Sequence, residues 1–264
     1  MKYLTFQGFI ALILLAGTPF AATAAEREEI VPGRPEITTR AMVVTPDKTP
    51  RAAAILYVGG NGDLSAMKNN FLQRIRQKLA DAGLLLVIPD APSDRAGKNN
   101  LQGNFRAGRD HAEDAKGLVQ FIKKQGNLPV FAIGTSRGST SAANTAGRLG
   151  SDLIAGVALT SSVTRKGQQG QISVYEAPVD KIVQPAFVMW HEADACSETT
   201  PADAAKLAPA LKASAKVTVK TLSGGSAPRS GPCDALSPHG FIGIEDQAAD
   251  AIIAWIDGVL AAKP

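Results

Sequence analysis

The sequence has few cysteines, few aromatic residues and little excess charge. Of its 264 residues only two are cysteines, 5% are aromatic, and Lys and Arg exceed Asp and Glu by 28 to 24. The cysteines form no C-x-x-C pair of the kind that binds zinc, so no metal is expected. A small charge excess without a Lys/Arg run does not favour nucleic acid as a partner. With 45% hydrophobic residues, the composition excludes a disordered tail or a collagen-like fibre.

A long hydrophobic run occurs only at the N-terminus. Lys2 precedes an apolar stretch from Phe9 to Phe20, and the small residues Ala22 to Ala25 follow before the charged Glu26 to Glu29. The stretch is shorter than the roughly 20 residues that a spanning helix needs, and small residues at that place are typical of a cleavage site. We therefore expect residues 1–25 to be a secretory signal peptide rather than an uncleaved anchor. The protein would then be periplasmic or secreted, without a stable membrane span.

Both cysteines, Cys196 and Cys233, lie in the part that would be exported. In an oxidising compartment a pair of this kind is expected to be bridged rather than free. The sequence therefore predicts a Cys196–Cys233 disulfide.

After the leader, short apolar runs alternate with longer amphipathic segments. The runs predict buried strands at residues 53–58, 84–88, 129–134, 153–160, 186–190 and 217–222. Helices are predicted where apolar side chains share one face, around residues 71–79, 115–122 and 244–260. Repeated strand–helix–strand units predict one α/β domain over residues 26–264, with a mostly parallel sheet and helices on both faces. Residues 36–44 are expected to add one or two antiparallel edge strands.

The longest segment without an assigned element runs from Val163 to Pro185. A long irregular segment inside a compact domain often forms a lid or a binding loop. This one is too short to make a large cap domain. We expect at most one short helix there, around Val179 to Val183, and a fairly open site.

The segment Gly134–Gly138 has the form G-x-S-x-G, with Ser136 at its centre. It lies between a predicted apolar strand and a helix of small residues that begins near Ser139. A nucleophile elbow needs this arrangement, because the serine sits in a strained turn and the glycines let strand and helix approach closely. The alternative is a Gly-Ser turn that only connects the two elements. The context favours the elbow, with Ser136 as the nucleophile.

A serine nucleophile needs a base, and the chain has three histidines. His239 follows the last apolar strand and precedes the final amphipathic helix, where the base falls in the order Ser, acid, His. His111 lies near the start of a helical pattern, where a capping or buried hydrogen-bonding role is the commoner one. His191 ends a strand and could be a structural neighbour of the site. We predict His239 as the base.

The acid is expected in the loop that follows the strand at residues 186–190. Asp194 lies in that loop, and Glu192 and Glu198 are its nearest competitors. An acidic loop residue is more often simply solvated. Asp194 is favoured because Cys196, two residues later, would tie this loop to Cys233, close to the base. The predicted disulfide would then hold the acid and base loops together.

Backbone N–H groups must also stabilise the oxyanion of an acyl-transfer reaction. The N–H of Arg137, directly after the nucleophile, is expected to be one donor. The loop Gly59–Asp63 would supply the other, from Gly60 or Asn61. Read alone, this loop is a flexible turn. No Lys-Ser/Thr follows it, which argues against a phosphate loop.

These motifs together resemble the α/β-hydrolases, in the compact form without a cap that dienelactone hydrolases and small esterases have. A narrower resemblance is to a group of exported bacterial α/β-hydrolases. It is carried by residues 59–64, 90–94, 134–138, 191–196, 231–233 and 237–241. The chain departs from the family pattern at the oxyanion loop, where no His precedes the glycines.

The resemblance implies a serine hydrolase with Ser136, Asp194 and His239 as its triad and no cofactor. We expect it to cleave small or short-acyl carboxylic esters through an acyl-enzyme. The low aromatic content does not suit a long lipid tunnel. A serine peptidase or thioesterase on the same fold, or a non-catalytic binding protein that retains it, are the alternatives. The sequence leaves the oligomeric state open.

Three arginines suggest a further property of the substrate. Arg106 and Arg109 precede a helix expected to flank the site, and the Arg137 side chain neighbours the nucleophile. Arginine binds carboxylates well, so a small acid-bearing ester is a hypothesis for the substrate. The alternative is that these arginines are structural ion-pair partners or solvated.

Overall fold

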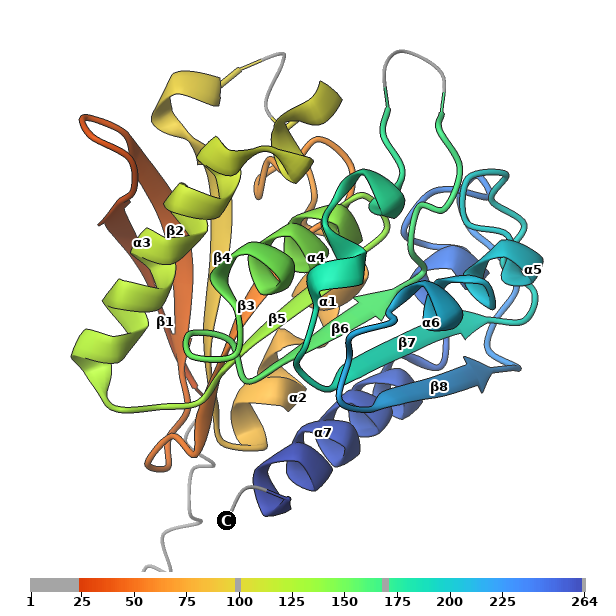
Figure 1. Cartoon of the computed structure of the whole chain (residues 1–264). Helices are drawn as coiled ribbons and strands as arrows, with labels where there is room; N and C mark the ends of the chain where they lie inside the picture. The colour runs from red at the N-terminus through yellow and green to blue at the C-terminus, as the bar shows by residue number, and fades with distance from the viewer. Residues whose placement is uncertain (1–23, 98–100, 168–170, 263–264) are drawn as a thin grey trace, which may run out of the picture.

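A computed structural model describes residues 24–97, 101–167 and 171–262. The central feature is an eight-stranded sheet in the order β1-β2-β4-β3-β5-β6-β7-β8, with helices on both faces (Figure 1). The predicted signal peptide lies outside the described residues except for its last two positions. The strands are β1 (Ala25–Pro32), β2 (Thr38–Thr45), β3 (Ala52–Tyr57), β4 (Leu84–Pro92), β5 (Val130–Thr135), β6 (Gly156–Thr160), β7 (Ala186–His191) and β8 (Val217–Leu222).

The sheet is parallel from β4 to β8, and β2 and β1 extend it antiparallel at one edge. The mostly parallel α/β sheet predicted from the sequence is therefore confirmed. Only the strand β1 is missing from the prediction. Its residues Glu26 to Glu29 are charged, and nearly all of β1 is exposed, so it lacks the apolar alternation that marks a strand. Charge on an edge strand is also what keeps it from pairing with other chains.

Two apolar layers cover the sheet. Strand β3 is buried throughout, with Ala53, Ile55 and Tyr57 in one layer and the alternate residues in the other. A strand buried on both faces is a continuous apolar run, which is why its sequence stands out. One layer packs against α3 (Arg109–Gln125), α4 (Gly138–Leu149), α5 (Pro201–Ala204) and α6 (Leu207–Ala210). The other packs against α1 (Phe71–Arg74), α2 (Arg76–Asp81) and α7 (Glu245–Ala261).

Two segments differ in detail from their predictions. The single helix expected at residues 71–79 is two short helices, α1 and α2, that meet at Ile75. The segment 163–185 contains two single-turn elements, η3 (Val174–Glu176) and η4 (Val179–Lys181), instead of one short helix. Both pack against α4, and no large cap is evident in the described part of the chain. The remaining 3-10 turns are η1 (Ser93–Arg95), η2 (Gly103–Ala107) and η5 (Pro238–Gly240).

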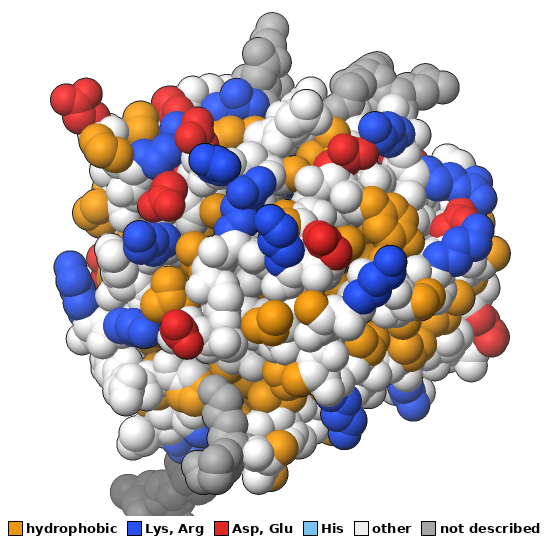
Figure 2. Space-filling model, in the orientation of Figure 1, with side chains coloured by type: hydrophobic (Ala, Val, Ile, Leu, Met, Phe, Trp, Pro, Cys, Tyr) orange, Lys and Arg blue, Asp and Glu red, His pale blue; other side chains and the backbone are white. Residues whose placement is uncertain are grey.

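Charged side chains are spread over the surface. Figure 2 shows Lys and Arg lying among Asp and Glu on one face rather than in a continuous band. Within the described ranges, no helix combines the length and apolar character needed to cross a membrane.

Candidate active site

Ser136 lies at the sharp turn between β5 and α4. Its φ is +54°, in the left-handed region that residues other than glycine rarely adopt. A Cβ at Gly134 would collide with the carbonyl oxygen of Gly138, and one at Gly138 would collide with that of Tyr57. The Ser136 N–H donates to the Thr160 carbonyl at 3.0 Å, which ties the turn to β6. The spacing G-x-S-x-G thus follows from how closely strand, turn and helix approach here.

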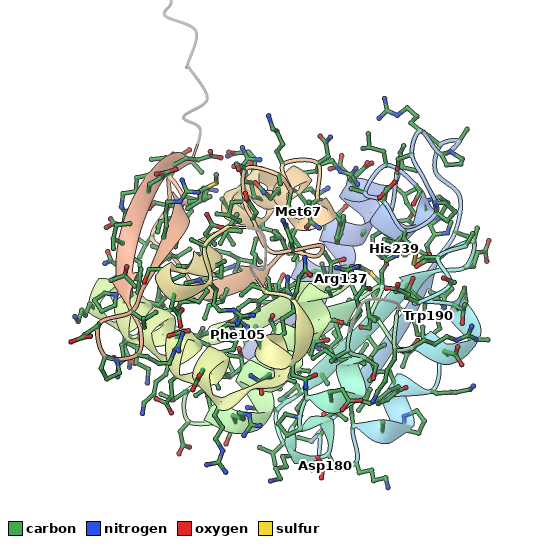
Figure 3. The ribbon with its side chains drawn as sticks, turned by 90° about the horizontal axis from the view of Figure 1, so that it is seen from above. Met67, Phe105, Arg137, Asp180, Trp190 and His239 are labelled. Carbon is green, nitrogen blue, oxygen red and sulfur yellow. A yellow bond between two sulfur atoms is a disulfide. The ribbon has the colours of Figure 1, made fainter. Side chains whose placement is uncertain are left out.

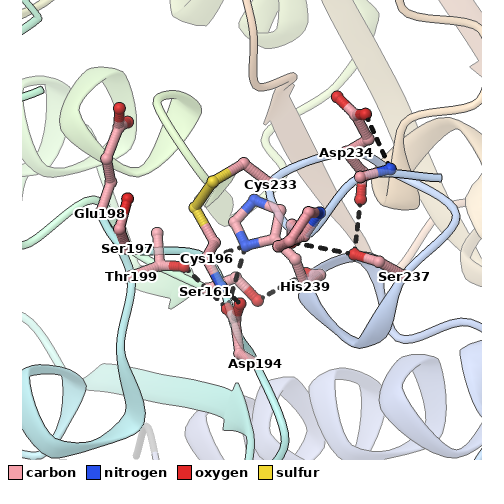
Figure 4. Close-up of a disulfide and its surroundings, with 12 residues drawn as sticks. Ser161, Asp194, Cys196, Ser197, Glu198, Thr199, Cys233, Asp234, Ser237 and His239 are labelled. Carbon is pink, nitrogen blue, oxygen red and sulfur yellow. Dashed lines mark hydrogen bonds and ion pairs between the residues drawn. A yellow bond between two sulfur atoms is a disulfide. The ribbon is translucent and has the colours of Figure 1, made fainter. Parts of the chain in front are cut away.

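The loops after β7 and β8 bring an acid and an imidazole together. His239 Nδ1 lies 3.0 Å from Asp194 Oδ2, and each of these residues is only 4% exposed (Figure 4). The other carboxylate oxygen, Oδ1, accepts the Cys196 N–H at 3.0 Å. Because a carboxylate only accepts hydrogen bonds, His239 carries its proton on Nδ1 and Nε2 is left as the basic nitrogen.

Two hydroxyl groups that the sequence analysis did not identify hold this pair in place. Thr199 Oγ1 donates to Asp194 Oδ2 at 2.8 Å and lies 3.1 Å from His239 Nδ1. Ser161 Oγ donates to the His239 carbonyl at 2.8 Å. Thr199 is five residues from Asp194 and Ser161 lies at the end of β6, so neither has a spacing that marks it in the sequence.

Arg74 anchors the loop that carries His239. Its guanidinium donates to the carbonyls of Ala235 and Gly240 and lies 3.3 Å from the carboxylate of Glu245. Burial lowers the pKa of Arg74. The position of the imidazole therefore depends on a residue more than a hundred positions earlier in the chain.

The predicted disulfide between Cys196 and Cys233 is present. It joins the loop of Asp194 to the loop of His239, and Figure 4 shows it beside both side chains. No free cysteine remains in the described chain.

A cavity of about 410 Å³ opens beside Ser136 and His239. Figure 3 shows three of its wall residues, Met67, Arg137 and His239, near one another and from different segments of the chain. Both disulfide cysteines also line the cavity. No hydrogen bond joins Ser136 to His239 among the described residues, although both residues line the same cavity.

The segment after β3 runs close to Ser136. A Cβ at Gly59 would lie 2.9 Å from Ser136 Cβ, so a larger residue there would crowd the serine. Within the described residues, neither the Gly60 nor the Arg137 backbone N–H donates a hydrogen bond to protein. Gly60 lines the cavity and Asn61 does not, which favours Gly60 of the two predicted donors.

The structure places neither Arg106 nor Arg109 in the wall of this cavity. Arg106 is 2% exposed and donates to Ser141 Oγ at 2.8 Å and to the Gly60 carbonyl at 3.3 Å. Through the Gly60 carbonyl it holds the segment after β3 in place, without itself lining the cavity. Burial, followed by the charge of Arg137, lowers the pKa of Arg106 to about 9. Arg109 is exposed at the start of α3.

Arg137 is the cationic group in the cavity wall. Burial lowers the pKa of its guanidinium, and the negative charge of Glu198 opposes that shift. Glu198 lines the same cavity, so the two opposite charges lie on its wall together. Glu192, the other competitor of Asp194, is exposed.

The other two histidines take structural positions. His191 binds the Gly224 carbonyl through Nε2 and the Ala193 N–H through Nδ1. His111 is buried in α3 between Tyr57 and Phe105, and neither ring nitrogen has a hydrogen-bond partner there. The described residues contain no cluster of three His, Cys, Asp or Glu that could hold a metal ion.

The same arrangement of sheet and helices occurs in solved structures that include an esterase and a dienelactone hydrolase. Est1E from Butyrivibrio proteoclasticus is similar with a TM-score of 0.64 at 13% identity, over 91% of this chain and 100% of that one. The esterase from Pyrobaculum calidifontis has a TM-score of 0.64 at 18% identity, over 90% and 87%. Dienelactone hydrolase from Anabaena variabilis has a TM-score of 0.62 at 14% identity, over 90% and 99%.

The chain has the α/β-hydrolase fold. No protein-family model matches the sequence, and no curated protein matches it. At 13–18% identity, the similarity shows the fold alone. That fold is shared by the esterases and the dienelactone hydrolase. The α/β-hydrolase fold and the resemblance to compact esterases that the sequence predicted are confirmed.

Proposed function

We propose that the protein is a serine hydrolase that cleaves small or short-acyl carboxylic esters. The observation that carries the proposal is the buried contact of 3.0 Å between His239 Nδ1 and Asp194 Oδ2. His239 lines a cavity together with Ser136, whose backbone has a left-handed conformation. A serine, an imidazole and an orienting carboxylate around one cavity form the constellation that acyl transfer needs. The esterase-like fold supports the same conclusion.

The proposed mechanism follows from this geometry. His239 Nε2 takes the hydroxyl proton as Ser136 Oγ attacks the ester carbonyl, and Asp194 stabilises the imidazolium that forms. The N–H groups of Arg137 and Gly60 donate to the carbonyl oxygen as it becomes negative. The tetrahedral intermediate then expels the alcohol, which receives the proton from His239. Water, activated by the same imidazole, releases the acid from the acyl-enzyme and restores the serine.

The cavity favours small substrates. Its volume is about 410 Å³, and its apolar wall comes from short segments that include Ala66, Met67, Phe71 and Leu236. Burial of a short acyl chain against this wall is favourable by about 0.8 kcal/mol per methylene. An acyl chain that outgrows the cavity would add methylenes without adding burial.

A panel of para-nitrophenyl esters of increasing acyl length tests the proposal. We expect kcat/KM to be highest for short acyl groups and to be lost in Ser136→Ala. Turnover of thioesters or peptides in preference to all of these esters would instead assign the fold to a thioesterase or a peptidase. Absence of Ser136-dependent turnover of any acyl substrate would favour a binding protein.

We also propose that the protein is exported and that residues 26–264 form one domain. The apolar N-terminal segment and the Cys196–Cys233 disulfide support export, because such bonds persist in oxidising compartments. Fractionation of cells that express the full sequence tests this. Mature protein that begins near residue 26 in the periplasm or medium is expected, and full-length protein in the cytosol would contradict the proposal.

A further inference from the structure

In the side-chain amide of Asn70, the oxygen has a hydrogen-bond partner among the described residues and the nitrogen has none. The residue is 8% exposed and caps α1, where its Oδ1 accepts the Leu72 N–H at 3.1 Å. Because the partner is a donor, the capping atom must be the oxygen, and this fixes the orientation of the amide. The Nδ2 group is therefore directed away from the helix, and it donates no hydrogen bond within the described part of the chain.

The Nδ2 group of Asn70 lies beside the nucleophile. It is 3.4 Å from the point where a Cβ on Gly59 would stand, and Ser136 Cβ is 2.9 Å from that same point. Asn70 and Ser136 both line the cavity. Asn70 Nδ2 is not completely buried, and Asn70 forms part of the cavity wall. An unpaired donor thus lies near Ser136, at the wall of the cavity that both residues line.

We propose that Asn70 is a further catalytic residue, whose Nδ2 donates a hydrogen bond to the substrate carbonyl oxygen as negative charge develops on it. This rests on the proposed serine hydrolase function. The donor is fixed before the substrate arrives, because the helix cap orients it, and such preorganised donors stabilise a transition state without reorganising. It would act beside the N–H groups of Gly60 and Arg137.

Capping does not by itself require an asparagine at this position. Serine and aspartate cap helices about as well as asparagine. Neither of them has the side-chain amide NH2 group of asparagine. Asn70→Ser and Asn70→Asp therefore keep an oxygen that can accept the Leu72 N–H, and remove the group that faces Ser136.

The test compares both variants with wild type and with Asn127→Ser, an exposed asparagine in the loop between α3 and β5. Thermal unfolding and steady-state hydrolysis of para-nitrophenyl acetate are measured for all four. We expect kcat to fall roughly 10²-fold in Asn70→Ser, with KM and the melting temperature little changed. Asn70→Asp should lose at least as much, because its carboxylate repels the oxyanion. Asn127→Ser should match wild type.

Active wild type together with an Asn70→Ser variant that keeps its kcat would overturn this inference and leave the proposed function intact. Loss of activity that follows a lower melting temperature in Asn70→Ser, with full activity in a folded Asn70→Asp, would assign the residue to the cap alone and overturn it as well. Wild type without Ser136-dependent activity on any ester would overturn the proposed function, and this inference with it.

Discussion

Removing the disulfide should cost stability much more than activity. The bond closes a loop of 37 residues, for which the entropy lost from the unfolded chain corresponds to about 4 kcal/mol of stability. The two loops that it joins also have anchors of their own. Asp194 accepts the Cys196 N–H, a backbone group that an alanine at 196 retains, and His239 is held through Ser161. The acid–base pair should therefore stay together when the sulfur atoms are gone.

The variant that tests this is Cys196→Ala with Cys233→Ala. Urea unfolding followed by tryptophan fluorescence should give a free energy of unfolding about 4 kcal/mol below that of the oxidised wild type. At 25 °C, kcat on para-nitrophenyl acetate should stay within about tenfold of wild type, or about 1.4 kcal/mol of barrier. The reasoning is wrong if stability does not change. It is also wrong if a folded variant loses more than about a hundredfold in kcat, because the bond would then be what positions the site.

Substitutions at two further residues, Thr199 and His111, give further tests. Thr199→Val removes the buried hydroxyl that donates to Asp194 Oδ2, so kcat should fall about tenfold and stability by about 1 to 3 kcal/mol, and Thr199→Ser should restore both. Equal kcat in the Val and Ser variants would show that the hydroxyl is not used. Burial, with help from Arg106 and Arg34, lowers the pKa of His111 to about 3. Its contribution to stability is present above pH 6.5 and is lost as the pH falls toward 3, because only the unfolded chain takes up the proton. Between pH 7 and pH 4.5, the free energy of unfolding measured in urea titrations should fall by about 2 to 3 kcal/mol less in His111→Phe than in wild type. An equal fall in both proteins would contradict this.

The features that sequence reasoning recovers are those fixed by backbone sterics or by continuous burial. Gly134 and Gly138 are required because neighbouring carbonyls leave no room for a Cβ. The turn around Ser136 can therefore be recognised from five consecutive residues of the sequence. The central strands are buried on both faces, and their apolar runs are correspondingly plain. The order of the chemistry-bearing loops along the chain favours His239 over His111, and the structure places His239, not His111, beside Asp194.

The features that it misses depend on contacts between distant segments. Arg74 reaches the His239 loop, and Arg106 supports the Gly60 segment, only after the sheet has formed. Asn70 has the sequence context of an ordinary helix cap, and its second role follows from the approach of Gly59 to Ser136. The exposed strand β1 has no apolar pattern, because most of its side chains face solvent while its backbone pairs with β2.

The central claim is that Ser136 is a nucleophile activated by His239. It is tested most directly by treating the protein with a fluorophosphonate probe and locating the adduct by mass spectrometry. One adduct per chain on Ser136 is predicted, absent in Ser136→Ala and formed much more slowly in His239→Gln. A wild-type protein that takes up no probe, or an adduct that persists in Ser136→Ala, would contradict the account.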